Sequence, residues 1–112
     1  MTEQEFLQVI YSGIKPGMDV QKPNKLSRIL DVTQAGNIYY LIGEQNKKAV
    51  TKKDLREVYR HLSDGNLTNR KISEISGSSR PCNNSTVKWI LSRFNLAEKD
   101  AKGNWHPTAK IQ

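Results

Sequence analysis

The chain has 112 residues, 36% of them apolar and 26% charged, and a net charge of +7, which suits one compact core and argues against a disordered chain. No segment approaches the roughly 20 apolar residues of a membrane span, and the acidic start Met-Thr-Glu-Gln-Glu lacks the basic residues of a secretory signal, so we expect a cytoplasmic protein without membrane contact. One cysteine, Cys82, with His61 and His106 gives neither an internal disulfide nor a zinc-ligand spacing, so no metal or cofactor is expected.

The first predicted element is a short amphipathic helix. Thr2 and Glu5 form a Ser/Thr-x-x-Glu capping box, in which each side chain can bond to the other residue's backbone amide. Apolar residues follow at positions i, i+3 and i+4: Phe6, Val9 and Ile10. This spacing predicts a helix that runs to about Ser12.

An antiparallel β-meander is predicted next. Segments 26–33 and 38–42 are rich in β-branched and aromatic residues, and the turn residues of 34–37 join them into a hairpin. A weaker strand is expected at 48–50, and 18–21 can pair at the other edge. The run Tyr39-Tyr40-Leu41-Ile42 is interpreted as core, and the alternative is a docking or dimerisation surface.

Two helices are predicted after the meander. Thr51 caps the first, and Leu55, Val58, Tyr59 and Leu62 form its apolar stripe up to about Ser63. Thr68 caps the second, which ends at Ser76 before Gly77. Leu67 and Ile72 occupy the two positions of a hydrophobic staple, which supports the start at Thr68.

A third helix and a hairpin complete the predicted elements. Segment 78–82 is expected to be a turn, because Pro81 disfavours helical angles at Arg80. Asn83, Asn84 or Ser85 then caps a helix whose apolar stripe is Val87, Ile90, Leu91 and Phe94. Residues 96–99 and 104–107 are predicted to form a small hairpin around the turn 100–103.

The positive charge lies in the second half of the chain. Residues 1–46 hold four basic and five acidic residues, whereas residues 47–112 hold fourteen basic and six acidic ones. A polyanion is the natural partner of such a segment, since basic side chains placed against phosphates release condensed counterions. Charge alone is equally compatible with a solvated basic surface.

The succession of three helices and a terminal hairpin resembles the winged helix-turn-helix family of DNA-binding domains. The resemblance covers residue 51 to about residue 108 and implies that 68–76 is the positioning helix, 84–94 the recognition helix and 98–107 the wing. In that family the recognition helix enters the major groove, and the wing often touches backbone or minor groove. The connection 77–83 is longer than the usual turn.

The fold expected from these observations is α+β. Residues 1–50 form the N-terminal helix and a small antiparallel β-meander, with a possible role in homodimer or protein contacts. Residues 51–112 form a three-helix winged helix-turn-helix with a C-terminal β-hairpin wing.

The residues expected to bind duplex DNA gather around the third helix and the wing. Asparagine can pair with adenine, lysine and arginine reach guanine, and hydroxyls suit bases or phosphates. The predicted contacts are Ser79, Arg80, Asn83, Asn84, Ser85, Thr86, Lys88, Arg93, Lys99 and Lys102. A capping role is the open alternative for Asn83, Asn84 and Ser85. Trp89 is interpreted as core boundary or as a stacking residue, and Trp105 as packing on the helices.

The sequence bears on three classes of function. An enzyme is disfavoured, because Cys82 with His61 or His106 is the only conceivable catalytic pair and the three lie on separate elements. A protein-interaction module and an RNA-binding protein are the alternatives, although the 7% of aromatic residues are mostly needed for packing. A non-catalytic DNA-binding protein, such as a transcription regulator or a module of a larger protein, is the first expectation.

Overall fold

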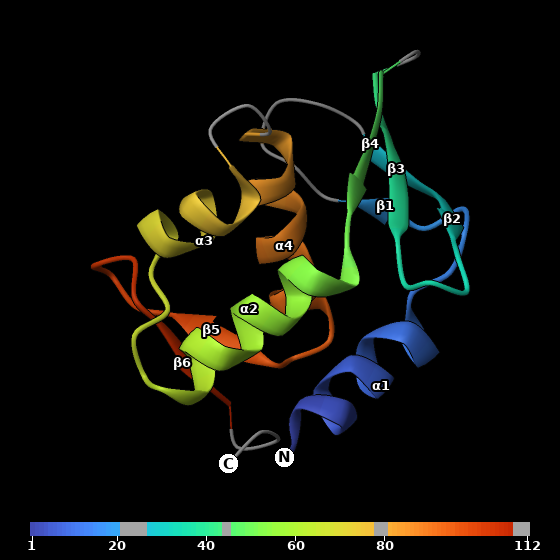
Figure 1. Ribbon diagram of the computed structural model, residues 1–112. Coiled ribbons are helices and arrows are strands. Elements are labelled where there is room, and N and C mark those ends of the chain that lie inside the picture. The colour runs from blue at the N-terminus through green and yellow to red at the C-terminus, as the bar shows by residue number, and fades with distance from the viewer. Residues whose placement is uncertain (21–26, 44–45, 78–80, 109–112) are drawn as a thin grey trace.

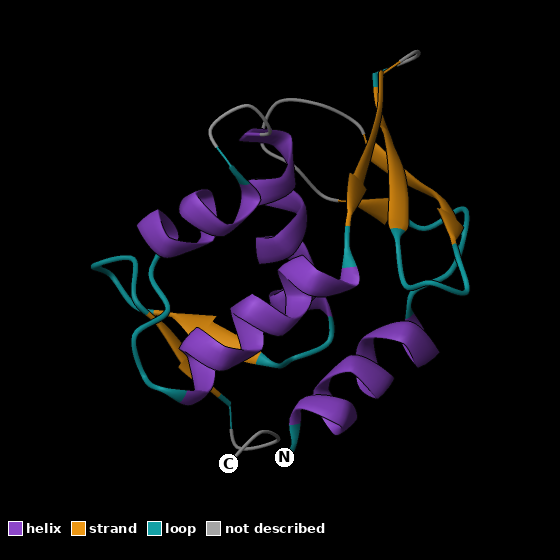
Figure 2. Ribbon diagram, in the orientation of Figure 1, coloured by secondary structure: helices purple, strands orange, loops and turns teal. Residues whose placement is uncertain are grey.

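The computed structural model describes residues 1–20, 27–43, 46–77 and 81–108 (Figure 1). These residues form four helices: α1 (Glu3–Gly13), α2 (Lys52–Ser63), α3 (Asn69–Ser76) and α4 (Pro81–Arg93). One antiparallel sheet contains β1 (Asp19–Val20), β2 (Ser27–Val32), β3 (Ile38–Ile42) and β4 (Asn46–Val50), and a separate hairpin contains β5 (Ala97–Lys99) and β6 (Trp105–Pro107). The sheet and the hairpin lie at opposite sides of the helices (Figure 2). The predicted α+β class is confirmed.

Threonine caps start three of the helices. At α1 the Glu5 amide donates to Thr2 Oγ1 at 3.1 Å, and the Thr2 amide donates to Glu5 Oε1 at 3.0 Å. Thr51 forms the same reciprocal box at α2, and the Thr68 hydroxyl accepts from the Lys71 amide at 3.0 Å at α3. All three caps were predicted, because each depends only on residues within one turn.

The four strands pair in chain order, β1-β2-β3-β4, as the meander predicted. Side chains alternate across β3, so Tyr40 and Ile42 are buried while Tyr39 and Leu41 are only half-buried on the opposite face. The expectation that Tyr39-Tyr40-Leu41-Ile42 is core is therefore confirmed for one face of the strand and wrong for the other.

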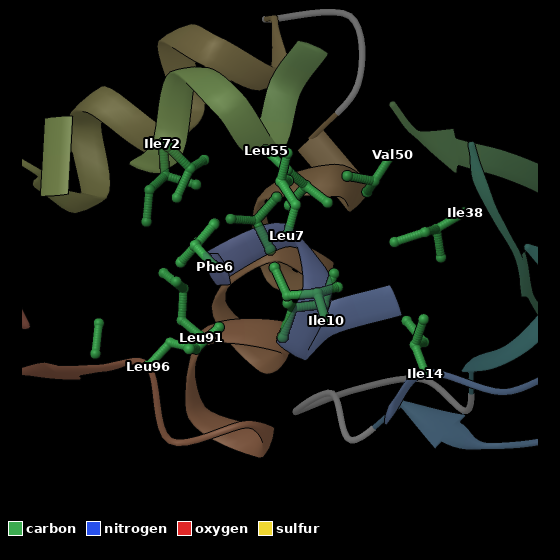
Figure 3. Packing of buried hydrophobic residues seen from close by; sticks show 14 of the residues in the cluster. Phe6, Leu7, Ile10, Ile14, Ile38, Val50, Leu55, Ile72, Leu91 and Leu96 are labelled. Atoms are coloured by element: carbon green, nitrogen blue, oxygen red, sulfur yellow. The ribbon is translucent and has the colours of Figure 1, made fainter. Parts of the chain in front are cut away.

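One continuous hydrophobic core joins all of these elements (Figure 3). Phe6 and Ile10 of α1 meet Ile38 of β3, Leu55 of α2 and Leu91 of α4 in a single cluster of buried residues. Helix α1 also packs against α2 through the rings of Phe6 and Tyr59, whose centroids are 5.1 Å apart. The core thus crosses the boundary at residue 50 that divides the two predicted parts.

The start of α4 differs from the prediction. The helix begins at Pro81 rather than after a cap at Asn83, Asn84 or Ser85. Proline is well suited to the first turn, because its missing amide hydrogen would have no intrahelical acceptor there. Asn83 and Asn84 therefore lie inside the first turn of α4, and only residues 77–80 connect α3 to it.

The hairpin is attached to the connection between α2 and α3. The Trp105 amide donates to the Leu67 carbonyl at 2.8 Å, and the Asn69 amide donates to the Gly103 carbonyl at 2.9 Å. The Trp105 indole Nε1–H also donates to Asn69 Oδ1 at 2.8 Å, and Trp105 is buried. The prediction that Trp105 packs on the helices is confirmed.

Candidate nucleic-acid interface

The buried side of α4 is broader than its apolar residues alone indicate. The residues buried along the helix are Asn83, Thr86, Val87, Ile90 and Leu91, which recur with the helical period. Asn83 is only 1% exposed and Thr86 is fully buried. The structure therefore corrects the expectation that Thr86 points away from the core, and it places Asn83, predicted as a DNA contact or a cap, on the same buried side of the helix.

Both buried polar residues make internal hydrogen bonds. The Asn83 side-chain amide donates to the Ala49 carbonyl of β4 at 2.8 Å, and its oxygen accepts from the Tyr40 hydroxyl of β3. The Thr86 hydroxyl donates to the Cys82 carbonyl at 3.2 Å. Asn83 thus fastens α4 to the sheet, and neither side chain is available to DNA in this structure.

Of the other residues predicted near the start of α4, the structure describes Asn84 but not Ser79 or Arg80. Asn84 is half-buried and its side-chain amide donates to Ser73 Oγ at 2.5 Å, so it ties α4 to α3. Ser79 and Arg80 lie outside the described residues.

A groove of about 670 Å³ lies between the exposed side of α4 and the hairpin. Helix α4 contributes Ser85, Lys88, Trp89, Ser92 and Arg93 to its lining. The hairpin contributes Lys99 and Trp105. The groove therefore brings together four predicted site residues: Ser85, Lys88, Arg93 and Lys99. Lys102 is exposed in the hairpin turn, outside this lining.

Three residues of the groove were not predicted as site residues: Trp89, Ser92 and Trp105. Ser92 and Trp89 share a helical stripe with Ser85 and Lys88, because these four positions follow the i, i+3, i+4, i+7 spacing. That spacing is a signal the sequence contains. Trp105 enters the groove through the tertiary fold, which no local pattern shows.

Aromatic contacts fix the wall of the groove. Trp89 packs edge-on against Phe94, with ring centroids 6.3 Å apart and an interplanar angle of 72°. The Arg93 guanidinium lies over the same Phe94 ring at 5.7 Å from its centroid. The prediction of Trp89 as core boundary fits its half-buried position, and its groove side leaves room for contact with a ligand.

Cations around the groove lack acidic partners. On α3, Glu74 pairs with Lys71 at 2.8 Å and with Arg70 at 3.7 Å. In contrast, a set of four basic residues forms no ion pair with any described residue: Lys88, Arg93, Lys99 and Lys102. Other exposed lysines, such as Lys53, are also unpaired, but three of these four line one concave surface.

Lys88 carries the clearest electrostatic effect in the groove. It is half-buried, and this burial together with the nearby charge of Lys99 lowers the pKa of its ammonium group from the usual value. Two cations held near each other without an acidic neighbour form a surface that attracts anions.

Comparison with known proteins returns no relative: no family model, no curated protein and no solved structure matches this chain. In the described part of the chain, no helix is both long and apolar enough to cross a bilayer, and no group of three or more His, Cys, Asp or Glu side chains could hold a metal ion. The groove is thus described by its own chemistry, which is cationic, hydroxyl-bearing and aromatic.

Proposed function

We propose that this protein binds duplex DNA, with α4 in the major groove and the β5–β6 hairpin beside it on the backbone. The observation that carries the proposal is the set of four basic residues without ion pairs along α4 and the hairpin: Lys88, Arg93, Lys99 and Lys102. Phosphates would supply the counter-charge that the described residues do not supply.

The arrangement of elements supports a winged helix-turn-helix interpretation. Helices α2, α3 and α4 are followed by a hairpin that packs against α4 and is fixed to the start of α3. A major groove is wide enough for one helix, and a hairpin at the end of that helix would lie over the neighbouring backbone. The exposed stripe of α4 offers Lys88, Arg93 and two serine hydroxyls, which suit base edges and phosphates.

The test is fluorescence anisotropy with labelled duplex DNA over a salt series. If four to six cations contact phosphates, a plot of log K against log salt concentration should have a slope of roughly −4 to −5. Single-stranded DNA and RNA of the same sequence are the comparison ligands, and we expect both to bind more weakly.

Absence of duplex binding at low salt, or a flat salt dependence, would contradict the proposal. Tighter binding of RNA or single strands would instead favour stacking on the groove tryptophans.

A further inference from the structure

Lys88 of α4 and Lys99 of β5 come from different elements and line the same groove. We propose that these two lysines bind one phosphate group between them, as a phosphate clamp (Lys88 and Lys99) that bridges the helix and the hairpin. The proposal deepens the proposed function, which supplies that phosphate from the DNA backbone.

The pairing of β5 with β6 directs Lys99 toward the groove. Lys99 is opposite Trp105 and Glu98 is opposite His106, and residues opposite each other point to the same side. Trp105 lines the groove, so Lys99 shares its side, whereas Glu98 and His106 are exposed on the other side. The nearest carboxylate along the strand is therefore turned away from Lys99.

The remaining acidic group of the hairpin is occupied. Asp100 accepts hydrogen bonds at 2.9 Å from the Lys102 amide, the Asn104 amide and His106 Nε2. Among the described residues, neither Lys88 nor Lys99 has an acidic partner.

An anion between the two ammonium groups would relieve an unfavourable arrangement. Lys88 is half-buried and feels the charge of Lys99, and both effects lower the pKa of Lys88. A phosphate would neutralise both cations and accept charge-assisted hydrogen bonds from both. Ser85 and Ser92, one turn before and one turn after Lys88, line the same groove and add hydroxyl donors.

The clamp is held in place before any ligand arrives. The hairpin is fixed by the Trp105–Leu67 backbone bond and by the Trp105–Asn69 side-chain bond. The Leu96 amide also donates to the Leu91 carbonyl at 2.9 Å, which ties the end of α4 to the start of β5. A site with fixed walls loses less conformational freedom when it binds.

The first experiment measures duplex DNA binding over a salt series with the full chain. The variants are Lys88→Met, Lys99→Met, the double variant and Lys15→Met, an exposed lysine after α1 that serves as matched control. If one phosphate is shared, the salt slope of the double variant should be less steep than that of the wild type by about 0.9. Two separate phosphates would make it less steep by about 1.8. Each single variant should lower the association constant by some factor. In the double variant the loss should be smaller than the product of the two single factors, by more than about twofold.

The second experiment tests the clamp without DNA. Both tryptophans of the sequence line the groove, so intrinsic tryptophan fluorescence reports on it. Inorganic phosphate is titrated at constant ionic strength, balanced with sodium chloride. We expect a saturable change for the wild type and for Lys15→Met, and none for Lys88→Met or Lys99→Met.

The outcomes separate the two proposals. Phosphate binding that both lysine variants abolish, without duplex binding, would support the clamp and overturn the DNA proposal. Duplex binding with multiplicative losses and no saturable phosphate signal would overturn the clamp and leave the DNA proposal standing.

Discussion

Asn83 illustrates how one buried amide positions a whole helix. It makes two hydrogen bonds to the sheet, one to the Ala49 carbonyl and one from the Tyr40 hydroxyl. Asn83→Ala removes both, and at about 0.5–1.5 kcal/mol each the free energy of unfolding should fall by about 1–3 kcal/mol. Chemical denaturation followed by circular dichroism measures this loss.

Tyr40→Phe provides the matched control for Asn83→Ala, because it removes one of the same two bonds. The two substitutions should be less than additive when combined. An Asn83→Ala protein that is as stable as the wild type but binds DNA poorly would return Asn83 to the interface.

Leu91 is the corresponding apolar position on α4. It is fully buried, so Leu91→Ala should lower the free energy of unfolding by about 2–5 kcal/mol through lost contacts and the cavity left behind. Thermal melting compares it with Ser92→Ala, an exposed neighbour on the same helix, which should melt close to the wild type. Equal melting temperatures for the two variants would show that the core beneath α4 is misassigned.

Local signals at single residues were predictable, and the inward turn of polar residues was not. Thr2, Thr51 and Thr68 were identified as caps because a cap needs only its own first turn. Asn83 and Thr86 were predicted as DNA contacts because polar side chains at the start of a helix or beside its apolar stripe suit that role, with a cap as the alternative for Asn83. Their partners, such as Ala49, lie far along the chain, and the sequence pattern contains no sign of them.

At the scale of elements, the hairpin turn depends on one carboxylate. The hydrogen bond from His106, followed by that from the Asn104 amide, lowers the pKa of Asp100 from 3.8 to about 2. Because the folded pKa lies below the unfolded one, ionised Asp100 stabilises the hairpin at pH above about 4, and this contribution is lost as the pH falls toward 2.

Nuclear magnetic resonance tests this dependence. The amide signals of Lys102 and Asn104, which donate to Asp100, should titrate with a midpoint near pH 2. In Asp100→Asn the two signals should lie away from their wild-type positions at neutral pH and should not titrate in this range. A wild-type midpoint near 3.8 would show that these bonds do not hold the turn.

The elements themselves were largely predictable, with one boundary misplaced. Apolar spacing located the helices and β-rich runs located the strands, because both periods follow from backbone geometry. The start of α4 was placed too late, since Pro81 was interpreted as a turn residue although proline is equally at home in the first turn of a helix.

At the scale of the whole molecule, the shared core predicts cooperative unfolding. Phe6 and Ile10 from the first part of the chain pack in one cluster with Leu55 and Leu91 from the second. Tryptophan fluorescence, which reports only on the second part, and circular dichroism, which reports on all helices, should therefore give coincident denaturation curves. Two separated transitions would show that the parts fold independently.

The groove could be predicted only in part, because it depends on contacts between residues that lie far apart in the sequence. The concentration of basic residues after residue 46 was visible in the sequence, and it predicted an anion-binding surface in the part of the chain that contains α4 and the hairpin. The concave surface forms only when Lys99 and Trp105 lie against α4, and the bonds from Trp105 to Leu67 and Asn69 fix the hairpin in that place from the start of α3. Such long-range bonds have no local signature.

Gly13 at the end of α1 lies against Phe94, so a substitution in α1 can alter the groove although no described residue of α1 lines it. A methyl group on Gly13 would lie 2.4 Å from the Phe94 ring, so the two positions are sterically coupled. In Gly13→Ala the Phe94 ring would have to shift, and this shift would change its edge contact with Trp89. Across variants of this chain, a larger residue at 13 should thus be accepted only with a smaller one at 94, as a covarying pair. Sequence change at the far end of the chain would in this way reshape the aromatic wall beside the lysines.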